Sequence, residues 1–214
     1  RIMERIHHRE TTPTSAQRRT GGLVWHTQGS GKSLTMVMLA RRLALLPGLA
    51  NPRIVLVTDR DDLDKQIEGT FKTCGLEPKR AGSARELLAL VQSPKAQIIT
   101  TLIQKFDRVS TLAKSFAVDS PDVFVLVDES HRSNFGSLAA KMRLLMPNAC
   151  YIGFTGTPVT RRERNTLNRF GGLIDSYTMD EAVRDGAVVK LLYESRMVDV
   201  TQNQEAIDKW FERQ

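Results

Sequence analysis

Residues 26–33 have the types and the spacing of a phosphate-binding loop. Glycines let the backbone approach phosphate oxygens closely, and successive N–H groups at the amino end of the following helix supply positive potential. We expect Lys32 to reach the β- and γ-phosphates and Ser33 to hold a magnesium ion. His26 stands where the strict G-x-x-x-x-G-K-[ST] pattern has its first glycine, so the loop is a looser form. The predicted nucleotide-binding residues are His26, Thr27, Gln28, Gly29, Ser30, Gly31, Lys32 and Ser33.

Two adjacent carboxylates, Asp128 and Glu129, follow the most apolar run of the chain, 123–127. A carboxylate at the carboxyl end of a central strand can hold magnesium through water, and a neighbouring glutamate can orient or activate an attacking water. We therefore predict that Asp128 binds the metal, that Glu129 is the catalytic base and that Lys32 completes the catalytic set. Standing alone, the pair would fit a polar strand end or a helix cap equally well.

Short β-branched runs alternate with longer helical patterns along the chain. This order predicts an α/β fold in which a parallel central sheet is flanked by helices on both faces. The phosphate-binding loop falls between the first strand and its helix, a context that disfavours a chance glycine-rich turn. Strands are expected at 23–26, 53–58, 97–101, 123–127 and 151–155, and helices at 32–46, 61–73, 86–91, 138–146 and 179–185.

A third motif, Thr155-Gly156-Thr157, closes the strand expected at 151–155. With the loop and the acidic pair it gives three motifs at the ends of three strands, in an order that resembles motifs I, II and III of superfamily two helicases. The resemblance implies a RecA-like P-loop domain that binds ATP and Mg²⁺. We assign this motor domain to residues 21–180. Residues 1–20 would end a preceding segment or form a linker, and 181–214 would lead towards a second motor domain.

Longer stretches resemble the motor subunit of type I restriction endonucleases, from about residue 20 to residue 195. The agreement is carried by residues 21–36, which contain W-H-T-Q-G-S-G-K-S, and by 57–64, 100–106, 127–133 and 153–158. In that family His26 is ordinary, whereas Ser130 stands where alanine or cysteine is more common. The resemblance implies an ATP-dependent translocase on double-stranded DNA, modification and specificity subunits as partners, and a bacterial or archaeal cytoplasm. The full subunit would also cleave DNA.

The same resemblance implies roles outside the nucleotide site. Arg60, Thr101 and Lys105 would touch the nucleic acid backbone without reading bases. A local ion pair for Arg60 and a solvated surface charge for Lys105 are the ordinary alternatives. For the residues that would couple hydrolysis to DNA binding, the ordinary alternatives are a solvent-facing side chain for His131 and a turn that merely ends a strand for 155–157. The residues that would couple hydrolysis to the grip on DNA are His131, Thr155, Gly156 and Thr157.

The composition is that of a folded, basic protein. Lysine and arginine total 31 against 24 acidic residues, and the resulting net charge of +7 favours a polyanionic partner such as nucleic acid. Cys74 and Cys150 form no disulfide framework or zinc pattern, and Cys150 lies in an apolar run typical of a buried thiol. No apolar stretch approaches the roughly 20 residues that span a bilayer, so no membrane partner is expected.

Two rival functions share these motifs. One is a stand-alone superfamily two helicase or remodelling ATPase, against which the W-H-T-Q lead-in argues. The other is a non-catalytic scaffold, against which Lys32, Asp128 and Glu129 argue because all three are present. The family's nuclease domain and second motor are not expected in this sequence, and the second motor would supply arginines to the cleft. We therefore expect ATP binding, weak or no hydrolysis and no DNA cleavage.

Overall fold

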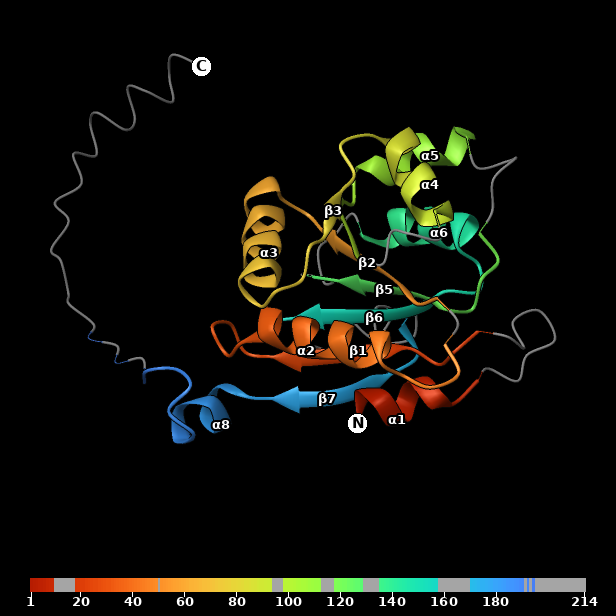
Figure 1. The fold of residues 1–214 in the computed structure, drawn as a ribbon. Coiled ribbons are helices and arrows are strands. Elements are labelled where there is room, and N and C mark those ends of the chain that lie inside the picture. Colours follow the sequence, from red (N-terminus) through yellow and green to blue (C-terminus); the bar gives the residue numbers. More distant parts are fainter. Residues whose placement is uncertain are drawn as a thin grey trace, which may run out of the picture.

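A parallel sheet of seven strands forms the centre of the computed structural model, which describes residues 1–9, 18–49, 51–93, 98–112, 118–128, 135–157, 170–190, 192 and 194 (Figure 1). The strand order is β3-β4-β2-β5-β6-β1-β7, and each pairing is parallel. The predicted α/β fold with a parallel central sheet is confirmed. The strands are β1 (Gly22–His26), β2 (Arg53–Thr58), β3 (Lys79–Arg80), β4 (Ile98–Leu102), β5 (Val123–Val127), β6 (Cys150–Thr155) and β7 (Leu173–Tyr177).

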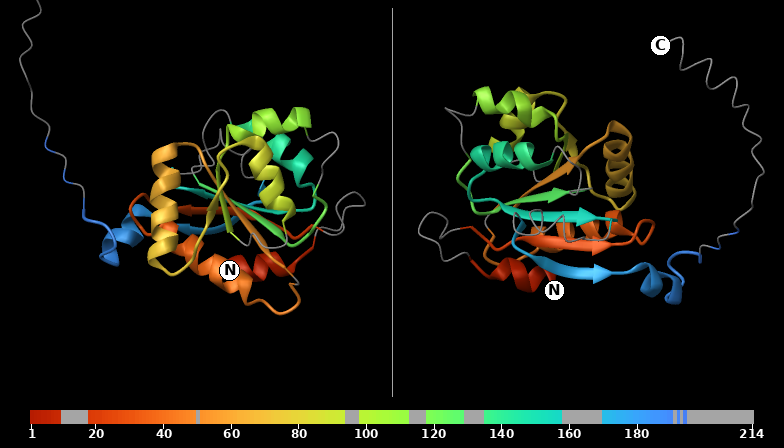
Figure 2. Two further views of the ribbon diagram at one scale, coloured as in Figure 1. Left: turned by 45° about the horizontal axis from the view of Figure 1, so that its top comes forward. Right: turned by 180° about the vertical axis from the view of Figure 1, so that it is seen from behind.

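Helices cover both faces of the sheet because the central strands are apolar on both sides. Along β2, Ile54 and Leu56 belong to one core, and Val55 and Val57 belong to the other. Helices α1, α2 and α3 pack into the first core, and α4, α5 and α6 pack into the second (Figure 2). The helices are α1 (Ile2–His7), α2 (Lys32–Ala44), α3 (Asp61–Thr73), α4 (Ala84–Gln92), α5 (Lys105–Leu112), α6 (Phe135–Leu145) and α8 (Met179–Arg184).

The amino-terminal helix is part of the packed domain. Ile6 of α1 is fully buried in the core beside α2, and Arg5 Nε donates to the Gly21 carbonyl at 3.3 Å. A linker would not bury a side chain in this way. The division of the chain at residues 20 and 180 stays a prediction, but residues 2–7 pack against the sheet that they precede.

The structure adds elements that the sequence did not predict, and the edge strand β7 matters most for the site. Leu173–Tyr177 pairs with β1, yet it is half-exposed and carries Asp175 and Ser176, so its pattern is not that of a buried strand. Helices α1 and α5 and the short strand β3 were also missed. The predicted roles of Glu129 and His131 fall on residues that lie outside the described part of the chain.

Cys74 and Cys150 are not joined in a disulfide, and Cys150 is buried in β6 as the sequence predicted. Within the described ranges, no helix combines the length and the apolar character needed to cross a membrane. Among the same residues, no three His, Cys, Asp or Glu side chains gather as a metal site.

Alanine substitutions at two glycines test the packing, because they should change the free energy of unfolding in opposite directions. A Cβ atom on Gly21, which leads into β1, would lie 1.9 Å from the Tyr151 carbonyl oxygen, so Gly21→Ala should lower the free energy of unfolding by about 1–3 kcal/mol. Gly69 lies in α3 with nothing within 4 Å of the same atom, so Gly69→Ala should raise it by about 0.5–1 kcal/mol. Urea unfolding of both variants measures this. Equal midpoints for Gly21→Ala and the parent protein would contradict the close approach.

Candidate nucleotide site

The segment between β1 and α2 turns sharply at the carboxyl edge of the sheet. Gly29 and Gly31 have φ angles of 80° and 90°, in the left-handed region that favours glycine. The N–H and the hydroxyl of Ser30 both donate to the Thr27 carbonyl, at 3.3 and 2.6 Å. Gly31 then accepts from the Thr35 N–H at 3.0 Å and so begins α2. The loop therefore stands at a helix amino end, which attracts anions.

The Thr155-Gly156-Thr157 motif meets the phosphate-binding loop in space. Strand β6 pairs with β1 so that Trp25 lies opposite Thr155. The buried hydroxyl of Thr155 accepts from the Thr157 N–H at 3.2 Å, which closes the turn. A Cβ atom on Gly156 would lie 2.9 Å from Lys32 Nζ. The ammonium group therefore occupies room that only a glycine leaves, while it donates to the His26 carbonyl at 3.4 Å.

A cavity of about 440 Å³ joins the loop to the carboxyl end of β5. Lys32, Ser33 and Asp128 all line it, although Asp128 is far from the other two in the sequence. A hydroxyl oxygen and a carboxylate oxygen suit Mg²⁺, which takes hard oxygen ligands and keeps several waters. The donor set therefore fits the predicted metal. The other lining residues are Gln28, Gly29, Gly31, Leu34, Leu63, Gln66 and Thr70.

Thr27 and His26, two of the predicted loop residues, do not line this cavity and contact β7 instead. Thr27 is 6% exposed, its N–H donates to the Tyr177 carbonyl at 2.9 Å, and its own carbonyl holds Ser30. His26 turns its ring towards β7, edge-on to Tyr177 with the ring centres 5.8 Å apart. Its Nε2 lies 3.8 Å from an Asp175 oxygen. Burial lowers the pKa of His26 below its ordinary 6.5, and Asp175 opposes that shift, so the net effect favours the neutral imidazole.

Sequence reasoning missed the wall that α3 contributes. Leu63, Gln66 and Thr70 follow one another at intervals of three and four residues, so they lie on one face of α3. The spacing was readable as helical. The surroundings of that face depend on how α3 packs beside α2. The local sequence pattern does not determine this packing.

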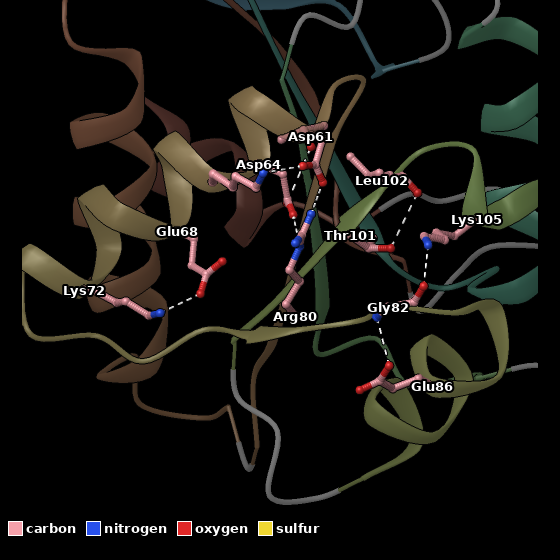
Figure 3. A network of polar contacts seen from close by, with 12 residues as sticks. Asp61, Asp64, Glu68, Lys72, Arg80, Gly82, Glu86, Thr101, Leu102 and Lys105 are labelled. Carbon is pink, nitrogen blue, oxygen red and sulfur yellow. Dashed lines mark hydrogen bonds and ion pairs between the residues drawn. The ribbon is translucent and has the colours of Figure 1, made fainter.

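The three predicted DNA contacts lie in different surroundings, and Figure 3 shows two of them, Thr101 and Lys105. Arg60 is exposed at the start of α3. Thr101 is 1% exposed, and its hydroxyl points to the Leu102 carbonyl at 3.5 Å, so it is not placed to touch a phosphate. Lys105 is half-buried and donates to the Gly82 carbonyl (Figure 3). Of the three, only Arg60 is exposed and makes no such contact with the part of the chain that the structure describes.

Arg80 of β3 holds the start of α3 in place beside Arg60. It donates to Asp64 at 2.7 Å and also binds Asp61 (Figure 3). Asp64 is fully buried, and burial raises the pKa of its carboxyl while Arg80 opposes the rise. Removing Arg80 would leave a buried carboxylate without its cation, which is costly.

Comparison with known proteins gives the family. The SWI2/SNF2 ATPase family model matches residues 1–214. The chain belongs to the SWI2/SNF2 ATPase family. The cavity at the loop, which Lys32, Ser33 and Asp128 line, is thus the candidate nucleotide site of an ATPase domain.

Two curated relatives of this ATPase domain are endonuclease subunits of type I restriction enzymes. The MjaIXP subunit of Methanocaldococcus jannaschii is 39% identical over 89% of this chain and 18% of that protein. The HindI subunit of Haemophilus influenzae is 37% identical over 81% of this chain and 18% of that protein. The resemblance predicted from the sequence is confirmed, and the chain spans about a fifth of the length of these relatives.

A solved structure shows the same fold. A nuclease-deletion mutant of the Type ISP restriction-modification enzyme LlaGI, in complex with a DNA substrate mimic, matches with a TM-score of 0.60. The match covers 79% of this chain and 19% of that one at 15% identity. At this identity the likeness establishes the architecture, which agrees with the predicted RecA-like domain.

The contact between Gly156 and Lys32 can be tested in the ATPase domain. Gly156→Ala should push Lys32 Nζ away from its place and weaken ATP binding about tenfold, since a lost charge-assisted hydrogen bond has about this effect. Stability should change little, because the displaced atom ends a flexible side chain. Titration calorimetry with Mg-ATP measures the affinity, and Gly69→Ala is the matched control. Unchanged affinity in Gly156→Ala would show that Lys32 acts from another position.

Proposed function

We propose that this chain is the first motor domain of a type I restriction enzyme, binding ATP with Mg²⁺ and using hydrolysis to move along double-stranded DNA. One observation carries the proposal: the cavity that brings Lys32, Ser33 and Asp128 together at the carboxyl edge of a parallel sheet. The relatives at 39% and 37% identity support the restriction setting over a stand-alone helicase or a scaffold.

Each residue has a distinct part in the proposed reaction. Lys32 and the loop N–H groups bind the phosphates and neutralise charge that develops during transfer. Ser33 and, through water, Asp128 hold Mg²⁺, which when bound offsets the charge of the triphosphate. Glu129 orients the attacking water and takes its proton. His131, Thr155, Gly156 and Thr157 pass the state of the γ-phosphate to the DNA grip.

The DNA path is proposed to run past the start of α3. Arg60 is exposed there, and the net charge of +7 favours a polyanion. Lys105 would join the path after leaving the Gly82 carbonyl. In the proposed setting the chain acts in a bacterial or archaeal cytoplasm with modification and specificity subunits and a second motor domain. Alone it would bind ATP, hydrolyse it weakly and leave DNA uncut.

Substitutions at Lys32 and Glu129 separate binding from turnover. Lys32→Ala should weaken ATP binding by about tenfold or more, since it removes a charged hydrogen bond. Glu129→Gln should keep that affinity and abolish DNA-stimulated phosphate release in the intact enzyme. Calorimetry and a phosphate-release assay measure the two effects. Arg42→Ala, on the exposed last turn of α2, is the control. Equal ATP affinity in Lys32→Ala and the parent protein would remove the loop from its role.

Arg60→Ala tests the DNA path. Loss of one phosphate contact should weaken binding to all duplex sequences alike and reduce the salt dependence of the affinity by about one counterion. Duplex binding of the intact enzyme at several salt concentrations measures this. Lys72→Ala, at the opposite end of α3, is the matched control and should bind DNA as the parent does. An unchanged salt dependence in Arg60→Ala would place the DNA elsewhere.

A further inference from the structure

Helix α3 places three side chains in the wall of the cavity at the phosphate-binding loop. Leu63, Gln66 and Thr70 line the same cavity as Ser33 and Asp128. Leu63 is apolar, and the Thr70 hydroxyl donates to the backbone carbonyl of Gln66 at 2.9 Å. The carboxamide of Gln66 is exposed and makes no hydrogen bond within the described ranges of the chain. Gln66 is therefore the side chain of α3 that can bind a polar ligand in the cavity.

The buried face of α3 sets the position of Gln66. Asp64, Ile67 and Phe71 are buried, and each follows directly after one of the three cavity residues. One residue corresponds to a rotation of about 100° around a helix axis, so the cavity residues lie beside the buried face. Arg80 of β3 donates to Asp64 at 2.7 Å and so holds the helix against the sheet (Figure 3). This anchoring keeps Gln66 at the cavity.

The order of the strands places Gln66 on the side of Asp128 that the loop leaves open. Strand β5, which ends before Asp128, has β6 on one side and β2, which leads into α3, on the other. Gln28 is the other carboxamide that lines the cavity, but a Cβ atom on Gly156, after β6, would lie 3.6 Å from the Gln28 Cβ. The two carboxamides therefore belong to opposite sides of the cavity.

We propose that Gln66 is a positioning residue that accepts a hydrogen bond from water bound to the Mg²⁺ ion of Mg-ATP. The inference rests on the proposed function, because it needs a triphosphate and its metal in the cavity. Mg²⁺ keeps several of its waters in protein sites, and those waters need acceptors besides Asp128. A carboxamide oxygen is such an acceptor and carries no charge. It therefore binds the hydrated ion without adding to the repulsion between Asp128 and the triphosphate.

The test separates the metal from the nucleotide by measuring ATP affinity with and without Mg²⁺. In the intact enzyme, Gln66→Ala should weaken Mg-ATP binding about three- to tenfold, the effect of one lost hydrogen bond, and should leave ATP binding in excess chelator unchanged. The variant should also need more Mg²⁺ for half-maximal ATP binding. Titration calorimetry measures both effects. Gln92→Ala makes the same change at the exposed end of α4, across the sheet from the first core, and should bind ATP as the parent does.

A second variant, Gln66→Glu, gives a result that a purely structural role would not produce. It keeps the length of the side chain and an acceptor oxygen, so Mg-ATP affinity should match that of the parent. Its added negative charge should weaken the binding of metal-free ATP, because the carboxylate repels the phosphates. Damage to α3 would instead lower both affinities by the same factor.

The remaining outcomes overturn the proposal and leave the function on which it rests to be judged separately. Equal losses for Mg-ATP and metal-free ATP in Gln66→Ala would mean that the side chain binds the nucleotide or only supports the fold. Unchanged affinity for both, with a loss of DNA-stimulated turnover, would assign Gln66 to a contact with another domain. In either case the proposed function stands if Lys32→Ala weakens ATP binding with and without Mg²⁺, and it fails if Lys32→Ala changes neither.

Discussion

The site depends on the parallel pairing of β1, β6 and β5. Parallel strands bring their carboxyl ends to one edge of the sheet, and the register sets Trp25 beside Thr155 and Gly153 beside Val127. The phosphate-binding loop, the Thr155-Gly156-Thr157 turn and Asp128 therefore emerge next to one another although long stretches of chain separate them. Antiparallel pairing would send one of the three to the opposite edge. The chemistry is thus a consequence of topology before it is one of individual side chains.

Close packing then fixes distances within that edge. Gly21 allows the backbone before β1 to approach Tyr151 of β6, and Gly156 after β6 leaves room for Lys32 Nζ of α2. Burial on both faces of the sheet makes this arrangement rigid, since strand residues alternate between two cores. A rigid sheet beneath the loop helps it to bind phosphate without a change of conformation.

The sequence predicted the features that local pattern encodes and missed those that depend on packing between distant segments. The all-apolar run 123–127 could only be a central strand, and the loop between strand 22–26 and its helix was evident from its glycines. Strand β7 was not predicted because it is an edge strand with one side open to solvent, so it can carry a polar residue such as Asp175 and lacks the apolar pattern of a buried strand. The contribution of α3 to the cavity and the burial of Thr101 were not predicted. Helical and strand periodicities of 3.6 and 2.0 residues show which residues share a face, but not which element packs against that face. Glu129 and His131 stay predictions.

The side chains at this edge of the sheet carry too little positive charge to balance a bound triphosphate. Among the described residues that line the cavity at the phosphate-binding loop, Lys32 is the only cation and Asp128 the only carboxylate. One ammonium group and the partial charges of loop N–H groups do not balance a triphosphate, and Asp128 adds to its repulsion. A divalent cation would reverse that repulsion, because Asp128 would then become its ligand. Further cations would be needed as negative charge builds on a transferred phosphoryl group, and an arginine supplied in cis or in trans often provides such a cation in enzymes that hydrolyse nucleoside triphosphates.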